Sequence, residues 1–163
     1  MKDRVSKTNY YLDIAQTVAE RSTCLRRKFG AIIVKNDVIV STGYNGAPRG
    51  RENCSDLGYC LRSQFNIPRG ERYELCRSLH AEDNAIIAAS REQMIGATLY
   101  LACVDYETGK LVEDTCCCSM CKRRVINAGI ETVVVRNTHD QFTVYKVQDW
   151  ITNDDSLSGK GGY

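Results

Sequence analysis

Histidine, long apolar runs and net charge are all scarce in this sequence. The chain of 163 residues has only two histidines, His80 and His139, so a zinc site would have to draw most of its ligands from sulfur. Every apolar stretch is broken within a few residues, so we expect no membrane span. The charged start at residues 1–4 has no apolar segment behind it, so we expect no secretion signal and a cytoplasmic location.

The overall composition is that of a soluble globular protein. Apolar residues make up 43% and charged residues 26% of the chain, and a net charge of +2 gives no support for a nucleic-acid partner. The length fits one domain, which we place at residues 1–150. The Gly-, Ser- and Asp-rich end, 151–163, is predicted to be disordered. Nine cysteines in a cytosolic chain of this size indicate metal binding rather than disulfides.

Hydrophobic periodicity predicts alternating helices and strands. The predicted elements, in order, are helix 8–21, strands 31–34 and 38–42, helix 80–89, strand 97–104, helix 118–128 and strand 131–135. The turn Lys35-Asn36-Asp37 joins the first two strands as a hairpin. This order predicts a three-layer α/β domain with a mixed central sheet and helices on both faces.

A cysteine-rich insertion at about 51–79 shows no regular period. It holds Cys54, Cys60 and Cys76 among many charged residues. A structureless stretch of this length inside a compact domain needs something to hold it in place. Metal ligation by these cysteines would do so.

Two short motifs together indicate one metal site. In His80-Ala81-Glu82, at the head of a predicted helix, the imidazole can hold zinc while the carboxylate moves protons beside it. In Cys118-Ser119-Met120-Cys121, a turn brings both sulfurs to one point. Three ligands leave the fourth tetrahedral position open, as in a catalytic rather than a structural zinc site. Either motif alone is weak, because an HxE often only begins a helix and a CxxC is also found in redox and structural sites.

The expected chemistry centres on Glu82. Zinc lowers the pKa of bound water to about 7, and a carboxylate two residues from a ligand could move a proton from that water to the leaving group. The alternative is a carboxylate that only interacts with the helix dipole. Its place beside a zinc ligand favours catalysis.

These motifs resemble the cytidine and deoxycytidylate deaminase superfamily, through residues 80–86 and 118–123. Four further segments, 21–24, 30–31, 43–50 and 126–130, resemble the deoxycytidylate (dCMP) deaminase family within it. The resemblance covers residues 12–135 in matching order. It implies a cytidine-deaminase-like fold and hydrolytic deamination of dCMP to dUMP and ammonia, which supplies thymidylate synthesis.

The resemblance also implies roles for individual residues. The catalytic zinc would be held by His80, Cys118 and Cys121, with Glu82 as the proton carrier. The substrate-binding residues would be Asn45, which would contact the sugar hydroxyl, Arg26, which would bind the phosphate, and Ala81. Other basic residues, Arg27, Lys28 and Arg49, are further candidates for the phosphate, and a solvated basic face explains each of them equally well.

Three further family features are implied. The first is a second, structural zinc on Cys24, Cys54, Cys60 and Cys76, for which ordinary unliganded buried cysteines are the alternative. The second is regulation, with dCTP activating and dTTP inhibiting through Gly43, Tyr44, Asn45 and Gly46. The third is a homohexamer. Cys103, Cys116 and Cys117 are left without a role.

One position departs from the family pattern. Cys117 stands where the family has a proline, so Cys116 or Cys117 could compete with Cys118 for the metal. Three alternatives to a dCMP deaminase stay open. They are a deaminase of dCTP or cytidine, a deaminase of tRNA adenosine, and a catalytically silent zinc-binding accessory protein of the same fold. Glu82 argues against the last, because a structural zinc site has no use for that carboxylate.

Overall fold

The centre of the molecule is a mixed five-stranded sheet. A computed structural model describes residues 3–159. The strands are β1 Arg27–Lys35, β2 Val38–Tyr44, β3 Thr98–Asp105, β4 Thr132–Arg136 and β5 Phe142–Lys146, in the order β2-β1-β3-β4-β5. The β3–β4 pair is parallel and the other three neighbouring pairs are antiparallel. The predicted mixed α/β sheet is therefore confirmed.

The predicted hairpin of β1 and β2 is confirmed, but β1 is longer than expected. Its turn residues, Asn36 and Asp37, have φ angles of 51° and 64°, in the left-handed region that Asn and Asp tolerate. The strand begins at Arg27 rather than at residue 31, because Arg27 pairs with Asp105 of β3. The basic segment that follows Leu25 therefore starts the sheet.

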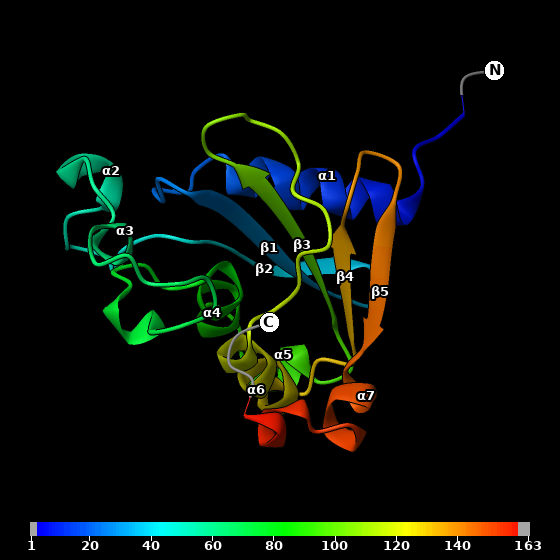
Figure 1. Ribbon diagram of the computed structural model, residues 1–163. Coiled ribbons are helices and arrows are strands. Elements are labelled where there is room, and N and C mark those ends of the chain that lie inside the picture. The colour runs from blue at the N-terminus through cyan, green and yellow to red at the C-terminus, as the bar shows by residue number, and fades with distance from the viewer. Residues whose placement is uncertain (1–2, 160–163) are drawn as a thin grey trace.

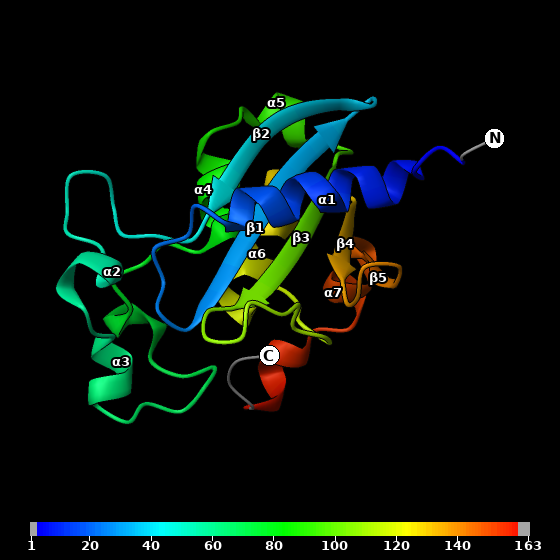
Figure 2. The same ribbon diagram turned by 90° about the horizontal axis from the view of Figure 1, so that it is seen from above.

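Helices cover both faces of the sheet (Figure 1). On one face lies α1 Lys7–Ala19, and on the other lie α4 Ala81–Ile87, α5 Arg91–Met94 and α6 Ser119–Ala128, as Figure 2 shows from above. Alternation along β1 serves both layers, since Ile32 packs with α1 while Ile33 joins the core under α4 and α6.

Two glycines let helix backbones lie directly on the sheet. A Cβ atom at Gly30 of β1 would lie 2.0 Å from the carbonyl oxygen of Ala15 in α1. A Cβ atom at Gly43 of β2 would lie 2.3 Å from the amide nitrogen of Ala85 and 2.4 Å from the carbonyl oxygen of Ala81, both in α4. Only glycine leaves room for these approaches.

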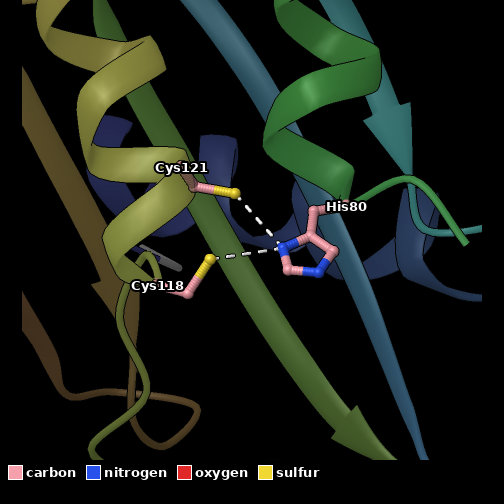
Figure 3. A group of neighbouring side chains, drawn as sticks. All are labelled: His80, Cys118 and Cys121. Atoms are coloured by element: carbon pink, nitrogen blue, oxygen red, sulfur yellow. Dashed lines mark hydrogen bonds between the residues drawn. The ribbon is translucent and has the colours of Figure 1, made fainter. Parts of the chain in front are cut away.

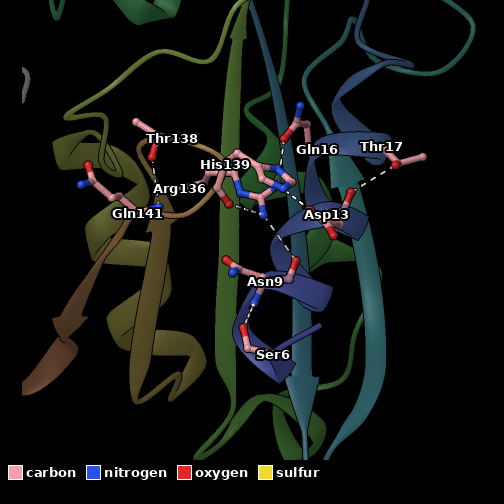
Figure 4. Close-up of polar contacts among 9 residues, drawn as sticks. All are labelled: Ser6, Asn9, Asp13, Gln16, Thr17, Arg136, Thr138, His139 and Gln141. Carbon is pink, nitrogen blue, oxygen red and sulfur yellow. Dashed lines mark hydrogen bonds and ion pairs between the residues drawn. The ribbon is translucent and has the colours of Figure 1, made fainter. Parts of the chain in front are cut away.

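A buried arginine at the end of β4 connects the sheet to α1 (Figure 4). Arg136, at the end of β4, is 1% exposed. Its Nη1 lies 2.8 Å from Asp13 Oδ1 and 2.9 Å from Gln16 Oε1. Its Nη2 donates to the carbonyl oxygens of Asn9 and His139. The second histidine of the chain thus lies in the turn after β4.

The segments predicted to lack structure contain short helices. The insertion holds α2 Cys54–Leu57, α3 Leu61–Gln64 and the 3-10 turn η1 Tyr73–Leu75, each too short to show an apolar period. The predicted disordered tail differs too, since α7 Val147–Thr152 and η2 Asp155–Ser158 are regular. The tail contacts α6 through Lys122, whose Nζ lies 5.4 Å from the centre of the Trp150 ring and 3.5 Å from Asp155 Oδ2. Residues 160–163 of that tail lie outside the described residues.

No helix within residues 3–159 has the length and apolar content needed to cross a bilayer.

Candidate active site

The two predicted motifs meet between α4 and α6 (Figure 3). His80 is the N-cap of α4, Cys118 is the N-cap of α6, and Cys121 lies in the first turn of α6. The Nδ1 atom of His80 lies 3.2 Å from Cys121 Sγ and 3.5 Å from Cys118 Sγ. Among the described residues, these three form the only group of at least three potential metal ligands whose atoms all lie within 4.8 Å of one another.

The spacing of these atoms fits a zinc ion. Bonds of about 2.0 Å to nitrogen and 2.3 Å to sulfur at a tetrahedral angle put the two ligand atoms about 3.5 Å apart. The nitrogen–sulfur distances of 3.2 and 3.5 Å are close to that value. His80 is grouped with Cys118 and Cys121, as the predicted register expects, and neither Cys116 nor Cys117 belongs to the group.

The local electrostatics favour a thiolate. The pKa of Cys118 is lowered to about 4 because Cys121 donates a hydrogen bond to it, with His80 adding to the effect against burial. The same hydrogen bond, together with burial, raises the pKa of Cys121. The environment thus favours the thiolate at Cys118, and thiolate is the form that binds metal.

Glu82 is a buried carboxyl beside this group. Its residue is 4% exposed, and burial raises the pKa of the carboxyl, which the charge of His80 opposes only in part. A carboxyl whose pKa is raised takes up a proton more readily than an exposed one, which suits a group that must accept and return a proton.

The three potential ligands His80, Cys118 and Cys121 are called the metal group below. A cavity of about 130 Å³ opens onto this group and onto Glu82. His80, Glu82 and Cys118 line it on the side of α4 and α6. Phe29 lines it from β1, and Asn45 lines it directly after the end of β2. Two of the predicted substrate residues behave differently here. Arg26 lines the cavity, whereas Ala81 is fully buried in the core and is not among the lining residues.

Most of the hydrogen-bonding groups of the Asn45 side chain are paired within the protein. Its Oδ1 accepts from Ser22 Oγ at 2.5 Å and from the Phe29 amide at 2.9 Å, and its Nδ2 donates to the Arg27 carbonyl at 2.9 Å. A carboxamide nitrogen carries two N–H groups, so one donor remains for a ligand.

The four cysteines of the predicted second site gather around the insertion without forming a compact group. Cys24, Cys60 and Cys76 line the cavity, and Cys54 is buried. Burial raises the pKa of Cys54, and the charges of the other three raise it further, so all four are neighbours. No three of their sulfur atoms, all within the described residues, lie within 4.8 Å of one another. The left-over Cys103 is buried in β3, and burial raises its pKa to about 12.

The predicted regulatory segment supports the segment that carries His80. Gly43 packs under α4, and the Tyr44 carbonyl accepts a hydrogen bond from Asn84 Nδ2 at 2.8 Å. Gly46 and Leu79 exchange two backbone hydrogen bonds of 3.2 and 2.8 Å. The loop after β2 is therefore joined to the residue that precedes His80.

Several lining residues were not predicted. Arg62, Arg69 and Tyr73 come from the insertion, and Ser78 and Cys116 also line the cavity. Their segments have no periodicity and no motif spacing, so position in the fold alone identifies them. The only sequence feature that pointed to them is the high density of charged residues in the insertion at 51–79.

A mixed sheet that carries a His/Cys/Cys group between two helix starts, with a buried glutamate beside it, defines the zinc-binding deaminase class. Residues 5–137 match the family model described as the cytidine and deoxycytidylate deaminase zinc-binding region, and the chain belongs to this family. Most of the curated relatives that it resembles are named, more narrowly, deoxycytidylate deaminases, and one, 32% identical over 80% of this chain and 59% of its own length, is named ComE operon protein 2 of Bacillus subtilis.

Two of these relatives illustrate the match. The chain is 34% identical over 137 residues to the deoxycytidylate deaminase of Schizosaccharomyces pombe, covering 84% of this chain and 39% of that protein. It is 39% identical over 129 residues to the deoxycytidylate deaminase of Mycobacterium phage D29, covering 77% and 90%. The chain thus spans about two fifths of the length of the yeast relative and most of the phage one.

Solved structures agree with this assignment. The dCMP deaminase from the cyanophage S-TIM5 in apo form has a TM-score of 0.56 and 27% identity, covering 85% of this chain and 88% of that one. The same enzyme in complex with dCMP and dUMP has a TM-score of 0.54 and 25% identity, covering 93% and 91%.

Proposed function

We propose that this protein catalyses the hydrolytic deamination of dCMP to dUMP and ammonia. The observation that carries the proposal is the position of Glu82, buried and lining the same cavity as His80 and Cys118. The relatives support the choice of substrate, since those compared above are named deoxycytidylate deaminases and the cyanophage enzyme was crystallised with dCMP and dUMP.

In this proposal His80, Cys118 and Cys121 hold the catalytic zinc. A zinc ion supplies an acidified water at neutral pH. The Glu82 carboxylate takes a proton from the attacking water and passes it to the ring nitrogen of cytosine as the oxygen adds to C4. Glu82 then takes the proton of the new C4 hydroxyl and delivers it to the amino group, so that the C4–N bond breaks as the C4 carbonyl forms, and ammonia leaves.

The substrate contacts are assigned on the same basis. Asn45 has one N–H donor free of the hydrogen bonds described above, and it would contact the sugar hydroxyl. Arg26 lines the cavity and would contact the phosphate. Ala81, which begins α4 between His80 and Glu82, would contribute its backbone rather than its buried side chain.

A second, structural zinc on Cys24, Cys54, Cys60 and Cys76 is part of the proposal. The four thiols are neighbours, and one ion would draw them together and hold the insertion against the sheet. The purified protein should then contain two zinc ions per chain, and Cys76→Ser should contain one. One zinc ion per chain in the wild-type protein would remove the structural site.

Regulation and assembly complete the proposal. dCTP would activate and dTTP would inhibit through residues 43–46, whose backbone reaches the segment before His80 through Leu79. The enzyme would act in the cytoplasm as a homohexamer and supply dUMP for thymidylate synthesis, without a nucleic-acid or membrane partner.

The test is ammonia release from dCMP, dCTP, deoxycytidine and an adenosine-containing RNA, each with and without dCTP or dTTP. Turnover of dCMP that dTTP suppresses is the expected result. Turnover of another substrate in preference to dCMP would identify a different deaminase. No ammonia from any substrate, in protein shown to contain zinc, would instead indicate a silent zinc-binding protein of the same fold.

A further inference from the structure

Four arginines line the cavity that holds Glu82. Arg26 and Arg27 come from the start of the sheet, and Arg62 and Arg69 come from the insertion. In both ribbon views the insertion lies beside the end of the sheet where β1 begins (Figures 1 and 2). Among the lining residues, Glu82 is the only carboxylic acid. The wall of the cavity is therefore strongly basic, and a ligand that fills it must be anionic at one end.

Arg62 holds the turn that carries Arg69. Arg62 is 6% exposed, and its Nη2 donates to the carbonyl oxygens of Pro68 at 2.8 Å and Glu71 at 2.7 Å. Its guanidinium also lies 4.5 Å from the centre of the Tyr73 ring. The two accepting carbonyls flank Arg69 in the chain, so this clamp fixes the backbone from which Arg69 reaches the cavity.

The clamp is connected to the metal group. The edge of the Tyr73 ring packs against the His80 ring, with centroids 5.0 Å apart and planes at 86°. The arginine-bearing turn is therefore held at a fixed place relative to His80 by Arg62 and Tyr73. A nucleotide whose base lies beside His80 and Glu82 would meet these arginines with its other end.

Two guanidinium nitrogens in this wall are buried without a partner. Arg27 Nη1 and Arg62 Nε have no hydrogen-bond acceptor among the described residues, although both residues line the cavity. A buried charged donor without an acceptor is costly, and an anionic ligand in the cavity would supply one. The charges of Arg27 and Arg69 both lower the pKa of Cys103 against burial, which places the two guanidinium groups near the same point of β3.

We infer that Arg27 and Arg69 bind the phosphate of the nucleotide substrate and that Arg62 is the positioning residue that orients Arg69. A phosphate dianion offers three acceptor oxygens, and guanidinium groups bind it through paired N–H donors. The inference rests on the proposed function for the identity of the nucleotide, and it adds a phosphate contact from the insertion to the one assigned to Arg26. It makes the start of β1 and the insertion together the part of the enzyme that distinguishes a nucleotide from a nucleoside.

The test compares dUMP with 2′-deoxyuridine, which differ only in the phosphate. Their Kd values are measured by calorimetry on zinc-loaded wild-type protein, Arg69→Ala, Arg27→Ala and the control Arg72→Ala. Arg72 belongs to the same loop but pairs with Glu74 at the exposed surface and does not line the cavity. Arg69→Ala and Arg27→Ala should each raise the Kd of dUMP about 10- to 100-fold and leave that of deoxyuridine unchanged. Arg72→Ala should change neither.

A separate readout tests Arg62. Arg62→Met should raise KM for dCMP while kcat stays near the wild-type value, and Arg62→Lys should recover part of the affinity. A purely structural role would instead weaken dUMP and deoxyuridine binding together. Inorganic phosphate should compete with dUMP for the wild-type protein but not with deoxyuridine, which tests the anion site even if a variant fails to fold.

The outcomes separate this inference from the proposed function. Equal Kd values of dUMP and deoxyuridine in the wild-type protein, or equal losses for both ligands in Arg69→Ala, would overturn the phosphate site whatever the ammonia assay shows. Absence of ammonia release from dCMP would overturn the deaminase, while a retained preference for dUMP would leave the phosphate site standing.

Discussion

At the scale of single residues, Glu82 is the proposed proton carrier. Glu82→Gln keeps the shape of the side chain but removes its ability to take a proton. We expect kcat for dCMP to fall about 10²- to 10⁴-fold while the zinc content is unchanged. Steady-state kinetics and metal analysis of the same preparation measure both.

The matched control for this variant is Asp83→Asn. Asp83 lies next to Glu82 but pairs with Arg124, at 3.1 Å between the carboxylate oxygen and Nε. It should keep activity close to that of the wild type. Near-wild-type turnover in Glu82→Gln would remove Glu82 from the mechanism.

The residues of the metal group could be predicted from sequence, but most of the cavity wall could not. The spacing of Cys118 and Cys121 brings the two sulfurs together, and His80 belongs to a motif known to complete such a pair. Arg62 and Tyr73 have no such spacing. Tyr73 reaches His80, and Arg62 reaches Tyr73, only because the insertion folds back, and that path depends on carbonyl contacts that no side-chain pattern encodes.

At the scale of elements, Gly43 sets the position of α4 on the sheet. Gly43→Ala places a methyl group against the backbone of Ala81 and Ala85, so α4 must shift. We expect a loss of about 1–3 kcal/mol in the free energy of unfolding and a fall in kcat/KM of about 10- to 100-fold, because His80 and Glu82 move with the helix. Urea denaturation and dCMP kinetics measure the two effects.

Gly30→Ala is the comparison for Gly43→Ala. It creates the same kind of clash on the opposite face, against Ala15 and Ala19 of α1, neither of which lines the cavity. Stability should fall and kcat/KM should stay within a few-fold of the wild type. Equal losses of kcat/KM in both variants would show that overpacking acts through general destabilisation.

The contact between α1 and the β1–β2 turn gives a prediction about pH. The Tyr11 hydroxyl donates to Asp37 Oδ1 at 2.5 Å, which raises the pKa of Tyr11 to about 12 and lowers that of Asp37. The stabilisation by Asp37 is present above its unfolded value of 3.8 and is lost as the pH falls through the lower folded pKa. The stabilisation by Tyr11 is present below 10.0 and is lost as the pH rises through about 12.

Tyr11→Phe should therefore be less stable than the wild type between about pH 4 and pH 10, with the difference shrinking beyond either limit. Urea midpoints measured across this range test the prediction. Tyr10→Phe, at a neighbouring ring that is 47% exposed, is the control. A stability difference that does not vary with pH would exclude the hydrogen bond as its cause.

At the scale of the whole molecule, Arg136 joins residues 120 or more positions apart. Arg136→Ala leaves Asp13 and Gln16 without their partner and opens a gap at a site that is 1% exposed. Because the Asp13 side chain is 47% exposed and water can replace the arginine there, we expect the free energy of unfolding to fall by about 1–3 kcal/mol. Arg123→Ala, at an exposed arginine of α6, should stay within about 0.5 kcal/mol of the wild type. Urea denaturation measures both, and equal stability of the two variants would contradict the prediction.

The core layers of the fold could be predicted because each element has an internal period. The hairpin and the two later strands alternate or run apolar, and α1, α4 and α6 have apolar faces. The tail could not be predicted in this way. Its helix α7 depends on Trp150 meeting Lys122 of α6, a contact between segments that are distant in the sequence.

The insertion is closed at its base. Arg77 donates from Nε and Nη2 to the Glu52 carbonyl at 3.3 and 3.0 Å, so the chain leaves and rejoins the core at nearly one point. The metal ligands and Glu82 lie outside this closed segment, whereas Arg62, Arg69 and Tyr73 lie within it. A segment closed at its base can vary in length at little entropic cost to the rest of the chain. If the inferred phosphate contacts hold, this insertion is where substrate preference could drift in related enzymes, provided that the packing of Tyr73 on His80 is kept.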